Sequence, residues 1–240
     1  MLCNWLYGYN HGDPQRNGEY RFLNTYLKNG MIFFDVGANV GNFTQHVLSI
    51  VPESKIHCFE PTPDTFEKLL DNCKSDPGVS LNNVGLSDES GTAKIKVYGK
   101  ASEINSLHIR RSLMIRQKDY MDFTEQTIQL GTIDKYVNEN AIPQIDLLKI
   151  DVEGNELRVL LGAKKSLSSG VIKAIQFEYG PSYVDASASL QEVYELLHGN
   201  GFELYRLLPF GKKKIRSFDP VWGLENYQYS NWVAIYCQQR

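Results

Sequence analysis

The sequence has few cysteines, no long apolar run and no marked excess of either charge. Its four cysteines, Cys3, Cys58, Cys73 and Cys237, include no C-x-x-C pair, which argues against a zinc cluster or a disulfide scaffold. No apolar stretch reaches the roughly 18 residues that a membrane-spanning helix needs, and the N-terminus does not have the pattern of a signal peptide. We therefore expect a cytoplasmic protein that does not contact a membrane.

The charge balance also excludes a general affinity for polyanions. The chain has 25 Lys and Arg residues against 28 Asp and Glu residues, a formal net charge of −3. Binding to nucleic acid or to an anionic surface would have to be local, because the whole molecule repels such partners slightly. At 240 residues the chain fits one large α/β domain, which we assign to residues 1–240.

Short apolar runs alternate with helical patterns along most of the chain, which is typical of parallel strands joined by crossover helices. We predict a doubly wound, mostly parallel, Rossmann-like sheet of seven strands, with the last strand antiparallel because a hairpin-like link precedes it. Its strands are expected at 31–37, 55–61, 79–88, 144–154 and 171–180, and in the segments "GFELYRLLP" and "NWVAIYC".

Three segments are expected to lie outside this sheet. Residues 1–30 contain the helical pattern "GEYRFLNTYL" and are predicted to be an N-terminal helical extension. Residues 91–99 alternate apolar with polar side chains, as a half-exposed strand does. Residues 100–126 show no clean period and are interpreted as an insertion over one rim of the sheet. The sequence does not indicate an oligomeric state.

A glycine loop follows the first predicted strand in the segment "FFDVGANVGNFT". It does not fit a P-loop, and a dinucleotide fingerprint starting at Gly37 would need glycine where Asn39 and Asn42 stand. Gly37 and Gly41 allow the backbone to approach a ligand, and no lysine is placed to meet a pyrophosphate. The loop therefore favours a cofactor without phosphate, S-adenosylmethionine, with Asp35 binding its amine directly or through water.

Glu60 supports the same cofactor, because it ends the second predicted strand. A carboxylate at this position can accept both ribose hydroxyls across the switch point of the sheet. Dehydrogenases also use an acid here, so Glu60 is informative only together with the loop. The alternative is a solvated carboxylate at a strand end.

Five strings stand in order along the chain: "FFDVGANVGNFT", "CFEPTPDTFEKL", "NNVGLSDESGTAKI", "TIDKYV" and "LLKIDVEGNELRVLLGA". They resemble those of the FkbM-type methyltransferases, within the seven-stranded class I of S-adenosylmethionine-dependent enzymes. The resemblance covers residues 31 to 180 and leaves the N-terminal 30 residues, the 100–126 insertion and the tail after 181 unmatched. It implies methyl transfer to oxygen, in a family whose members modify sugars, polyketides, peptides and other secondary products.

The resemblance also implies which residues bind the cofactor. The loop residues should face the methionine portion, Glu60 should bind the ribose, and the segment from Val84 to Ser87 should lie near the adenine. The complete predicted set is Asp35, Gly37, Asn39, Gly41, Glu60, Pro61, Val84, Leu86 and Ser87.

The predicted catalytic residues are Asp151, Lys149 and Glu178. Strand periodicity places Lys149 and Asp151 on one face of the fourth predicted strand. Asp151 stands where this strand emerges at the cofactor edge, and Glu178 occupies the matching end of the fifth strand. Asp151 could act as general base, tuned by Lys149 or by another carboxylate. Alternatively, Asp151 and Glu178 could hold a divalent cation, as in the related catechol methyltransferases. Those enzymes follow the second acid with asparagine, whereas this chain has Tyr179, so a divalent metal is possible but not favoured and we name no metal ligands.

Two alternative interpretations of the predicted catalytic residues stay open. Lys149 could form a buried ion pair with Glu153, in which case Glu153 would have no catalytic role. His108 and His11 are further candidates for a base at the acceptor site.

Two basic segments, "HIRRSLMIRQKD" (108–119) and "FGKKKIRSF" (210–218), suggest a positive rim around the active site. Such a rim would receive an anionic or carrier-tethered hydroxyl acceptor, although two solvated loops would look the same. A nucleic-acid methyltransferase and a non-catalytic cofactor-binding protein are the alternative functions, and we expect no nucleic-acid partner.

Overall fold

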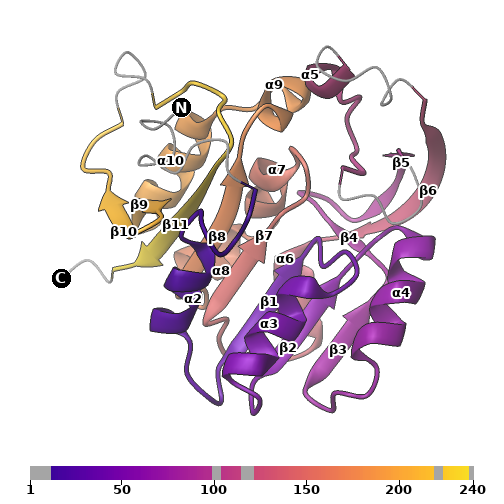
Figure 1. Cartoon of the computed structure of the whole chain (residues 1–240), viewed down its shortest axis with the longest axis horizontal. Coiled ribbons are helices and arrows are strands. Elements are labelled where there is room, and N and C mark those ends of the chain that lie inside the picture. Colours follow the sequence, from indigo (N-terminus) through magenta and orange to yellow (C-terminus); the bar gives the residue numbers. More distant parts are fainter. Residues whose placement is uncertain (1–11, 99–103, 115–121, 219–223, 238–240) are drawn as a thin grey trace.

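The computed structural model describes residues 12–98, 104–114, 122–218 and 224–237. Its main sheet has the strand order β10-β9-β11-β8-β7-β1-β2-β3 (Figure 1). Five neighbouring strands of this sheet run parallel, namely β3, β2, β1, β7 and β8. β11 lies antiparallel between β8 and β9, so the predicted α/β fold class is confirmed. The strands are β1 (Ile32–Val36), β2 (Lys55–Phe59), β3 (Val79–Asn82), β7 (Leu147–Ile150), β8 (Ala174–Tyr179), β9 (Phe202–Leu208), β10 (Gly211–Lys214) and β11 (Ser230–Tyr236).

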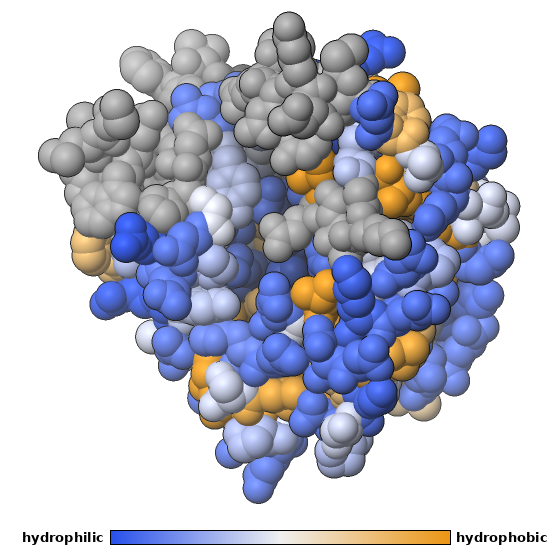
Figure 2. All heavy atoms as spheres, turned by 45° about the vertical axis from the view of Figure 1, so that its right-hand side comes forward, coloured by the Kyte–Doolittle hydropathy of each residue, from blue (hydrophilic) through white to orange (hydrophobic). Residues whose placement is uncertain are grey.

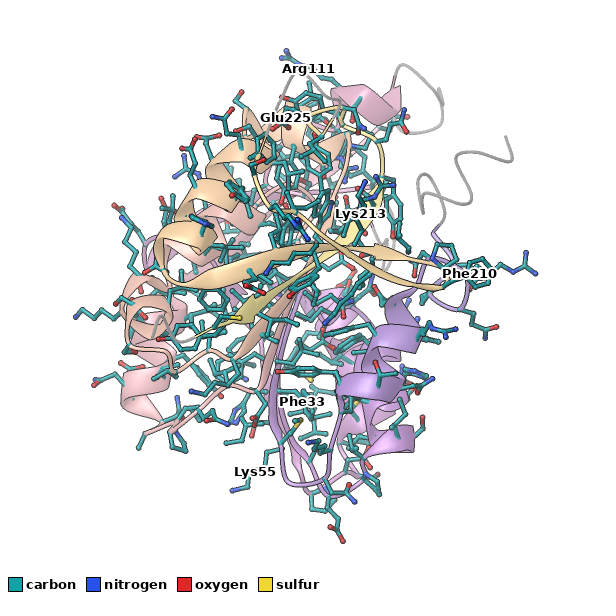
Figure 3. The ribbon with its side chains drawn as sticks, turned by 90° about the vertical axis from the view of Figure 1, so that its left-hand side faces the viewer. Phe33, Lys55, Arg111, Phe210, Lys213 and Glu225 are labelled. Atoms are coloured by element: carbon teal, nitrogen blue, oxygen red, sulfur yellow. The ribbon has the colours of Figure 1, made fainter. Side chains whose placement is uncertain are left out.

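The eighth strand, β10, was not predicted. It forms an antiparallel hairpin with β9 at the edge of the sheet, and all four of its residues are exposed. A lysine-rich edge strand has no buried face to produce an alternating pattern, and its charges keep the edge from pairing further. Phe210, 67% exposed at the hairpin tip, points away from the body (Figure 3).

Helices cover both faces of the main sheet because successive strand residues point to opposite sides. Phe33 packs beneath α2 (Glu19–Tyr26), α3 (Asn42–Ile50) and α4 (Pro63–Cys73). Phe34 packs in the core on the other face, formed with α6 (Ile133–Glu139), α7 (Glu156–Leu161), α8 (Lys164–Ser168) and α10 (Leu190–Gly199). Two short helices, α5 (Arg111–Met114) and α9 (Ser182–Ala186), complete the set in the described part of the chain.

A second, three-stranded sheet lies beside the carboxyl end of the main sheet (Figure 1), in the order β4-β6-β5. Its strands are β4 (Gly85–Leu86), β5 (Gly91–Val97) and β6 (Thr124–Gly131). The half-exposed strand expected at 91–99 is therefore present. Two boundaries differ: the strand predicted at 79–88 divides between the two sheets as β3 and β4, and the predicted insertion at 100–126 overlaps β6.

The N-terminal extension and the insertion are described only in part. Residues 12–30 contain α2, the helix predicted there. Of the insertion, residues 104–114 and 122–126 are described. No helix in the described ranges is long and apolar enough to cross a membrane.

Candidate active site

A polar row crosses the apolar sheet on the face that carries α2 and α3. In the strand register Asp35 lies beside Lys149, and Lys149 lies beside Gln176. The Lys149 ammonium lies 3.5 Å from Asp35 Oδ1 and 3.3 Å from Asp151 Oδ2. Burial lowers the pKa of Lys149, but Asp151 and Asp35 raise it more. Lys149 is therefore a buried cation held between carboxylates.

The predicted alternative, an ion pair between Lys149 and Glu153, is wrong. Glu153 instead pairs with the buried Arg110, which also lies 3.6 Å from Asp185. The reason is local: Glu153 and Gly154 both take positive φ angles, so the chain leaves the strand direction before Glu153.

A cavity of about 810 Å³ opens at the carboxyl ends of the parallel strands, and Figure 2 shows the hollow bordered by hydrophilic side chains. This is the edge at which open α/β sheets bind ligands. Eight predicted site residues line it: Gly37, Asn39, Glu60, Pro61, Leu86, Lys149, Asp151 and Glu178.

The glycine loop forms the floor of this cavity. Gly37 has φ 79°, and a Cβ there would collide with the carbonyl oxygen of Asp151, so glycine lets the loop pack against the end of β7. The Gly37 and Ala38 amides donate to the Phe59 carbonyl at 3.0 and 3.1 Å. Asn39 follows with φ 49°, and its buried Oδ1 has no hydrogen-bond partner among the described residues. That oxygen is available to a ligand donor.

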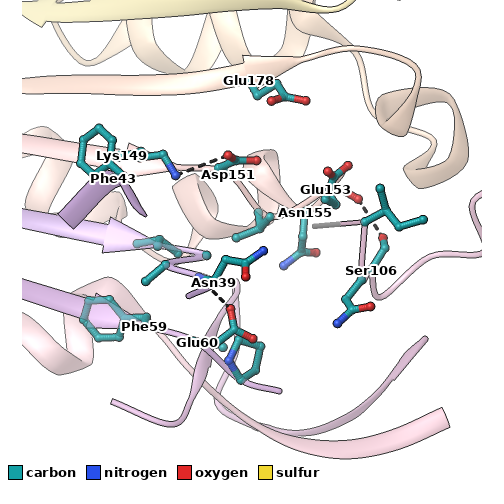
Figure 4. A pocket seen from close by; sticks show the side chains of 18 of the residues that line it. Asn39, Phe43, Phe59, Glu60, Ser106, Lys149, Asp151, Glu153, Asn155 and Glu178 are labelled. Atoms are coloured by element: carbon teal, nitrogen blue, oxygen red, sulfur yellow. Dashed lines mark hydrogen bonds and ion pairs between the residues drawn. The ribbon is translucent and has the colours of Figure 1, made fainter. Parts of the chain in front are cut away.

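Glu60 is oriented by the backbone on both sides. Its Oε2 accepts a hydrogen bond from the Asn39 amide at 3.1 Å (Figure 4). Its Oε1 accepts one from the Thr62 amide at 2.9 Å. Burial raises the pKa of Glu60, although these hydrogen bonds oppose the shift. With 7% exposure it is not the solvated carboxylate of the alternative reading. Each oxygen keeps a lone pair for a hydroxyl donor.

Four predicted cofactor residues do not line the cavity, and two of them, Asp35 and Gly41, belong to the segment of the glycine loop. Asp35 is fully buried, accepts a 2.7 Å hydrogen bond from Thr44 and pairs with Lys149, so in this structure it neutralises a lysine. Gly41 has φ 92°, and a Cβ there would come within 2.8 Å of Cys73 Sγ. Its glycine serves the packing of α3 against α4.

The segment predicted to lie near the adenine reaches the cavity only in part. Leu86 lines the cavity, whereas Val84 and Ser87 do not. Ser87 Oγ donates to Asp88 and lies 3.3 Å from Asn155 Nδ2. Asn155 does line the cavity, so Ser87 acts on the site by holding a neighbour. This arrangement follows from the close approach of α7 to β4, which the local sequence does not encode.

The second sheet supplies an apolar wall that the sequence analysis missed. Ile95 and Ile128, 5% and 3% exposed, and Leu130 line the cavity together with residues 104–107. Such a wall suits the face of a heteroaromatic ring. The alternation of strand 91–99 was the available signal, but its buried side could not be assigned to the cavity without the pairing of β5 with β6.

The far half of the cavity is acidic. One carboxylate oxygen each of Asp151, Glu153 and Glu178 lies within 4.8 Å of the others, and Figure 4 shows Glu178 on the side of Asp151, across from Glu60. Burial, together with Asp151 and Glu153, raises the pKa of Glu178. Lys149 pairs with Asp151 and Arg110 pairs with Glu153. Three carboxylates this close together could also hold a metal ion, so the absence of a metal stays a prediction.

The N-terminal segment also enters the cavity, which the sequence analysis did not anticipate. Asn17, Glu19 and Tyr20 line it beside Tyr229. The Tyr20 ring stacks on His46, with 3.5 Å between ring centroids. A helix that precedes the first strand of the sheet carries no local signal that it returns to the active site.

Of the two histidines predicted as alternative bases, only His108 is described by the structure. His108 is half-buried and is not among the residues that line the cavity. His11 lies outside the described residues.

Comparison with known proteins now decides the family. The profile of the "Methyltransferase FkbM domain" matches residues 35–204. The chain belongs to the FkbM methyltransferase family. It is thus an S-adenosylmethionine-dependent methyltransferase, as the resemblance implied, and the unpartnered Asn39 oxygen and the oriented Glu60 carboxylate fit that donor's amine and hydroxyl groups.

Three curated relatives are similar over most of this methyltransferase. They are the hexuronic acid methyltransferase AglP of Haloferax volcanii (29% identity, 67% of this chain and 62% of the relative), the 31-O-demethyl-FK506 methyltransferase FkbM of Streptomyces tacrolimicus (28%, 73% and 74%) and the 2-O-methyltransferase NoeI of Sinorhizobium fredii (25%, 75% and 75%). The match thus spans less than two thirds of AglP.

Solved structures give the fold alone. A methyltransferase from Streptococcus mutans in complex with SAH superimposes with a TM-score of 0.50 at 11% identity, covering 91% of this chain and 95% of that chain.

Proposed function

We propose that this methyltransferase transfers the methyl group of S-adenosylmethionine to a hydroxyl oxygen of a small molecule, with a sugar hydroxyl as the favoured acceptor. The observation that supports this most is the division of one cavity into a donor half, with Glu60 and Asn39, and an acidic half, with Asp151 and Glu178. Oxygen is a poor nucleophile until its proton is removed, and carboxylates beside the methyl group can remove it.

In the donor half, Glu60 would accept the ribose hydroxyls and the isoleucines of β5 and β6 would cover the adenine. The bound donor supplies an electrophilic methyl group on a positively charged sulfur. Asp151 is held by Lys149 at the cavity wall, where it would position the acceptor. Burial and the neighbouring carboxylates raise the pKa of Glu178 and so favour its neutral form, in which the carboxyl would donate a hydrogen bond to the acceptor.

The charge of the acceptor stays a prediction. The relatives include enzymes named for a hexuronic acid and for a 2-O position, which supports a carbohydrate. The expected basic rim is weaker than its sequence suggests, since Arg110 is buried in internal ion pairs and Lys214 pairs with Glu203. Lys118 lies outside the described residues.

The first test is binding of S-adenosylhomocysteine by calorimetry to the wild type, to Glu60→Ala and to the exposed control Glu53→Ala. Hydrogen bonds to a charged group are worth about 1.5–3 kcal/mol, so we expect Glu60→Ala to weaken binding by about 10- to 100-fold and Glu53→Ala to leave it unchanged. No binding to the wild type would overturn the proposal.

A second assay tests the acceptor. Transfer of labelled methyl groups would be measured to p-nitrophenyl glucoside, p-nitrophenyl glucuronide and a short oligonucleotide, each with Mg²⁺ and with EDTA. Methylation of a glycoside that persists in EDTA supports the proposal without a metal. Methylation of the oligonucleotide alone would favour a nucleic-acid enzyme, and binding without any transfer would favour a non-catalytic protein.

A further inference from the structure

Glu19, the first residue of α2, stands in the acidic half of the cavity although it comes from the part of the chain before the sheet. It lines the same cavity as Asp151 and Glu178. Gln176, the buried next member of the polar row after Lys149, shares a hydrogen bond with it. Three strands and one N-terminal helix thus converge on this carboxylate.

The local structure holds Glu19 firmly. Asn17 Oδ1 accepts a 2.9 Å hydrogen bond from the Glu19 amide, which fixes the start of α2. Gly18 has φ 97°, and a Cβ there would collide with the carbonyl oxygen of Leu208, so α2 begins in direct contact with the end of β9. Figure 1 shows α2 lying beside α3 over the main sheet. The position of Glu19 is therefore a property of the fold.

The residues around Glu19 carry polar atoms that a ligand would satisfy. Asn17 Nδ2 and His46 Nε2 are both buried, both residues line the cavity, and neither atom has a hydrogen-bond partner in the described part of the chain. Buried polar atoms without a partner cost free energy unless a ligand or water meets them. A polyhydroxylated acceptor would meet them, and an apolar one would not.

The charged and titratable groups that face Glu19 come from every element packed against it. They are Lys149 and Asp151 at the end of β7, Asp35 on β1, Tyr20 on α2 itself and Tyr229 beside β11. Burial raises the pKa of Glu19 to about 7, with Asp151 and Asp35 adding to the rise and Lys149 opposing it. A base that titrates near neutral pH is well matched to taking a hydroxyl proton.

We propose that Glu19 is the general base of methyl transfer and that the segment from Asn17 to Tyr20, with His46, forms the wall that receives a polyhydroxylated acceptor. In this step the acceptor O–H bond breaks and its proton goes to the Glu19 carboxylate. The oxygen forms the new bond to the methyl carbon, and the carbon–sulfur bond breaks with its electron pair left on sulfur. The inference rests on the proposed function, since it presumes the donor in the same cavity.

The decisive test needs no acceptor. A sulfonium placed near Glu19 favours its ionised form, so S-adenosylmethionine should release protons on binding. A group with a pKa near 7 that falls by about one unit releases about 0.4 proton at pH 7. Calorimetry in buffers of different ionisation enthalpy measures this number. We expect release in the wild type and in Glu178→Gln, little release with S-adenosylhomocysteine, and none in Glu19→Gln.

The outcomes separate the two proposals. If neither ligand binds the wild type, the proposed function fails. If both bind and Glu19→Gln releases as many protons as the wild type, only the role of Glu19 fails. Glu19→Asp should recover part of the release, and unchanged S-adenosylhomocysteine affinity in Glu19→Gln verifies that the variant is folded.

Kinetics with the glycoside accepted in the screen provide the second readout. We expect kcat/KM of Glu19→Gln to fall by about 100- to 10,000-fold, the range for loss of a general base. The decline of kcat/KM below pH 7 should disappear in the variant. A variant that keeps the wild-type rate and pH profile would overturn the assignment.

Discussion

At the scale of single residues, the site depends on buried carboxyl groups, and the free-energy cost of burying them is offset in different ways. Glu156 is 1% exposed, and its side chain accepts hydrogen bonds from the amides of Val152 and Gly154. It thereby fixes the turn between β7 and α7 that presents Asp151. Burial still raises the pKa of Glu156 to about 8, so the folded protein holds a proton there at neutral pH.

This raised pKa has a consequence for stability. A carboxyl whose pKa is about 8 when folded and 4.5 when unfolded stabilises the fold fully below the unfolded value and loses this contribution as pH rises toward 8. In Glu156→Gln that loss should be absent. As pH rises from about 4.5 to about 8, the unfolding free energy of the variant should therefore increase relative to that of the wild type by up to about 1.4 kcal/mol per pH unit.

Urea unfolding at pH 5, 6.5 and 8 measures the difference. The exposed Glu67→Gln is the matched control and should follow the wild type at each pH. If the unfolding free energies of Glu156→Gln and the wild type change equally with pH, the prediction is contradicted. Glu19 and Glu178 titrate in the same direction, so the comparison of variants isolates Glu156 and the wild-type slope alone does not.

At the scale of elements, α2 completes an active site whose other parts come from the ends of strands. Its packing on β9 is as much a part of the site as the glycine loop, because Gly18 contacts the Leu208 carbonyl. Phe22 and Leu23 bury the helix against the sheet. Moving α2 should therefore change chemistry and stability together.

Replacing Gly18 with alanine tests this coupling. Gly18 and Gly30 both have positive φ, but a Cβ at Gly30 would meet nothing within 4 Å. Gly30→Ala should cost about 1–2 kcal/mol of unfolding free energy from its left-handed backbone alone. Gly18→Ala should cost clearly more and should also abolish proton release on donor binding.

Urea unfolding and the calorimetric assay measure the two effects. Equal costs for Gly18→Ala and Gly30→Ala would show that α2 tolerates displacement, and retained proton release would show that Glu19 does not depend on this contact.

At the scale of the whole molecule, the net charge of −3 conceals a strongly acidic cavity. The lining includes Glu19, Glu60, Asp151, Glu153 and Glu178, and Lys149 is its only lysine or arginine among the described residues. A cationic donor is attracted to such a cavity more than its uncharged product. The field therefore favours binding of the donor and release of the product.

Salt should reveal this preference. Raising NaCl from about 50 to about 500 mM shortens the screening length, so we expect the affinity for S-adenosylmethionine to fall by severalfold and that for S-adenosylhomocysteine to change little. Calorimetry at both salt concentrations measures the ratio of the affinity for S-adenosylmethionine to that for S-adenosylhomocysteine. A ratio independent of salt would show that short-range contacts, and not the field, discriminate between the two ligands.

Much of this molecule was predictable. The alternation of apolar runs with helical patterns predicted the parallel sheet, and the antiparallel position of β11 followed from the long link before it. Strand periodicity correctly placed Lys149 on the face shared with Asp151. Elements without a one-sided burial pattern were missed, as for β10, where every side chain is exposed.

The site was predictable only where residues act through their own loop or strand end. Gly37, Asn39, Glu60 and Asp151 line the cavity because a glycine turn and the end of a parallel strand determine their position. Asp35 shows the limit of this reasoning, since its partner Lys149 belongs to a strand 114 residues away.

The sequence by itself determined the sheet, its cofactor edge and the family, because those depend on periodicity and on motifs read along the chain. Only the tertiary structure decided which carboxylates share one cavity. Glu19 lies near Lys149 and Gln176 because α2 packs on β9. Arg110, from the segment 104–114, forms an ion pair with Glu153. Such contacts join residues far apart in the chain, and their free energies depend on burial and on neighbouring charge, which no local pattern records.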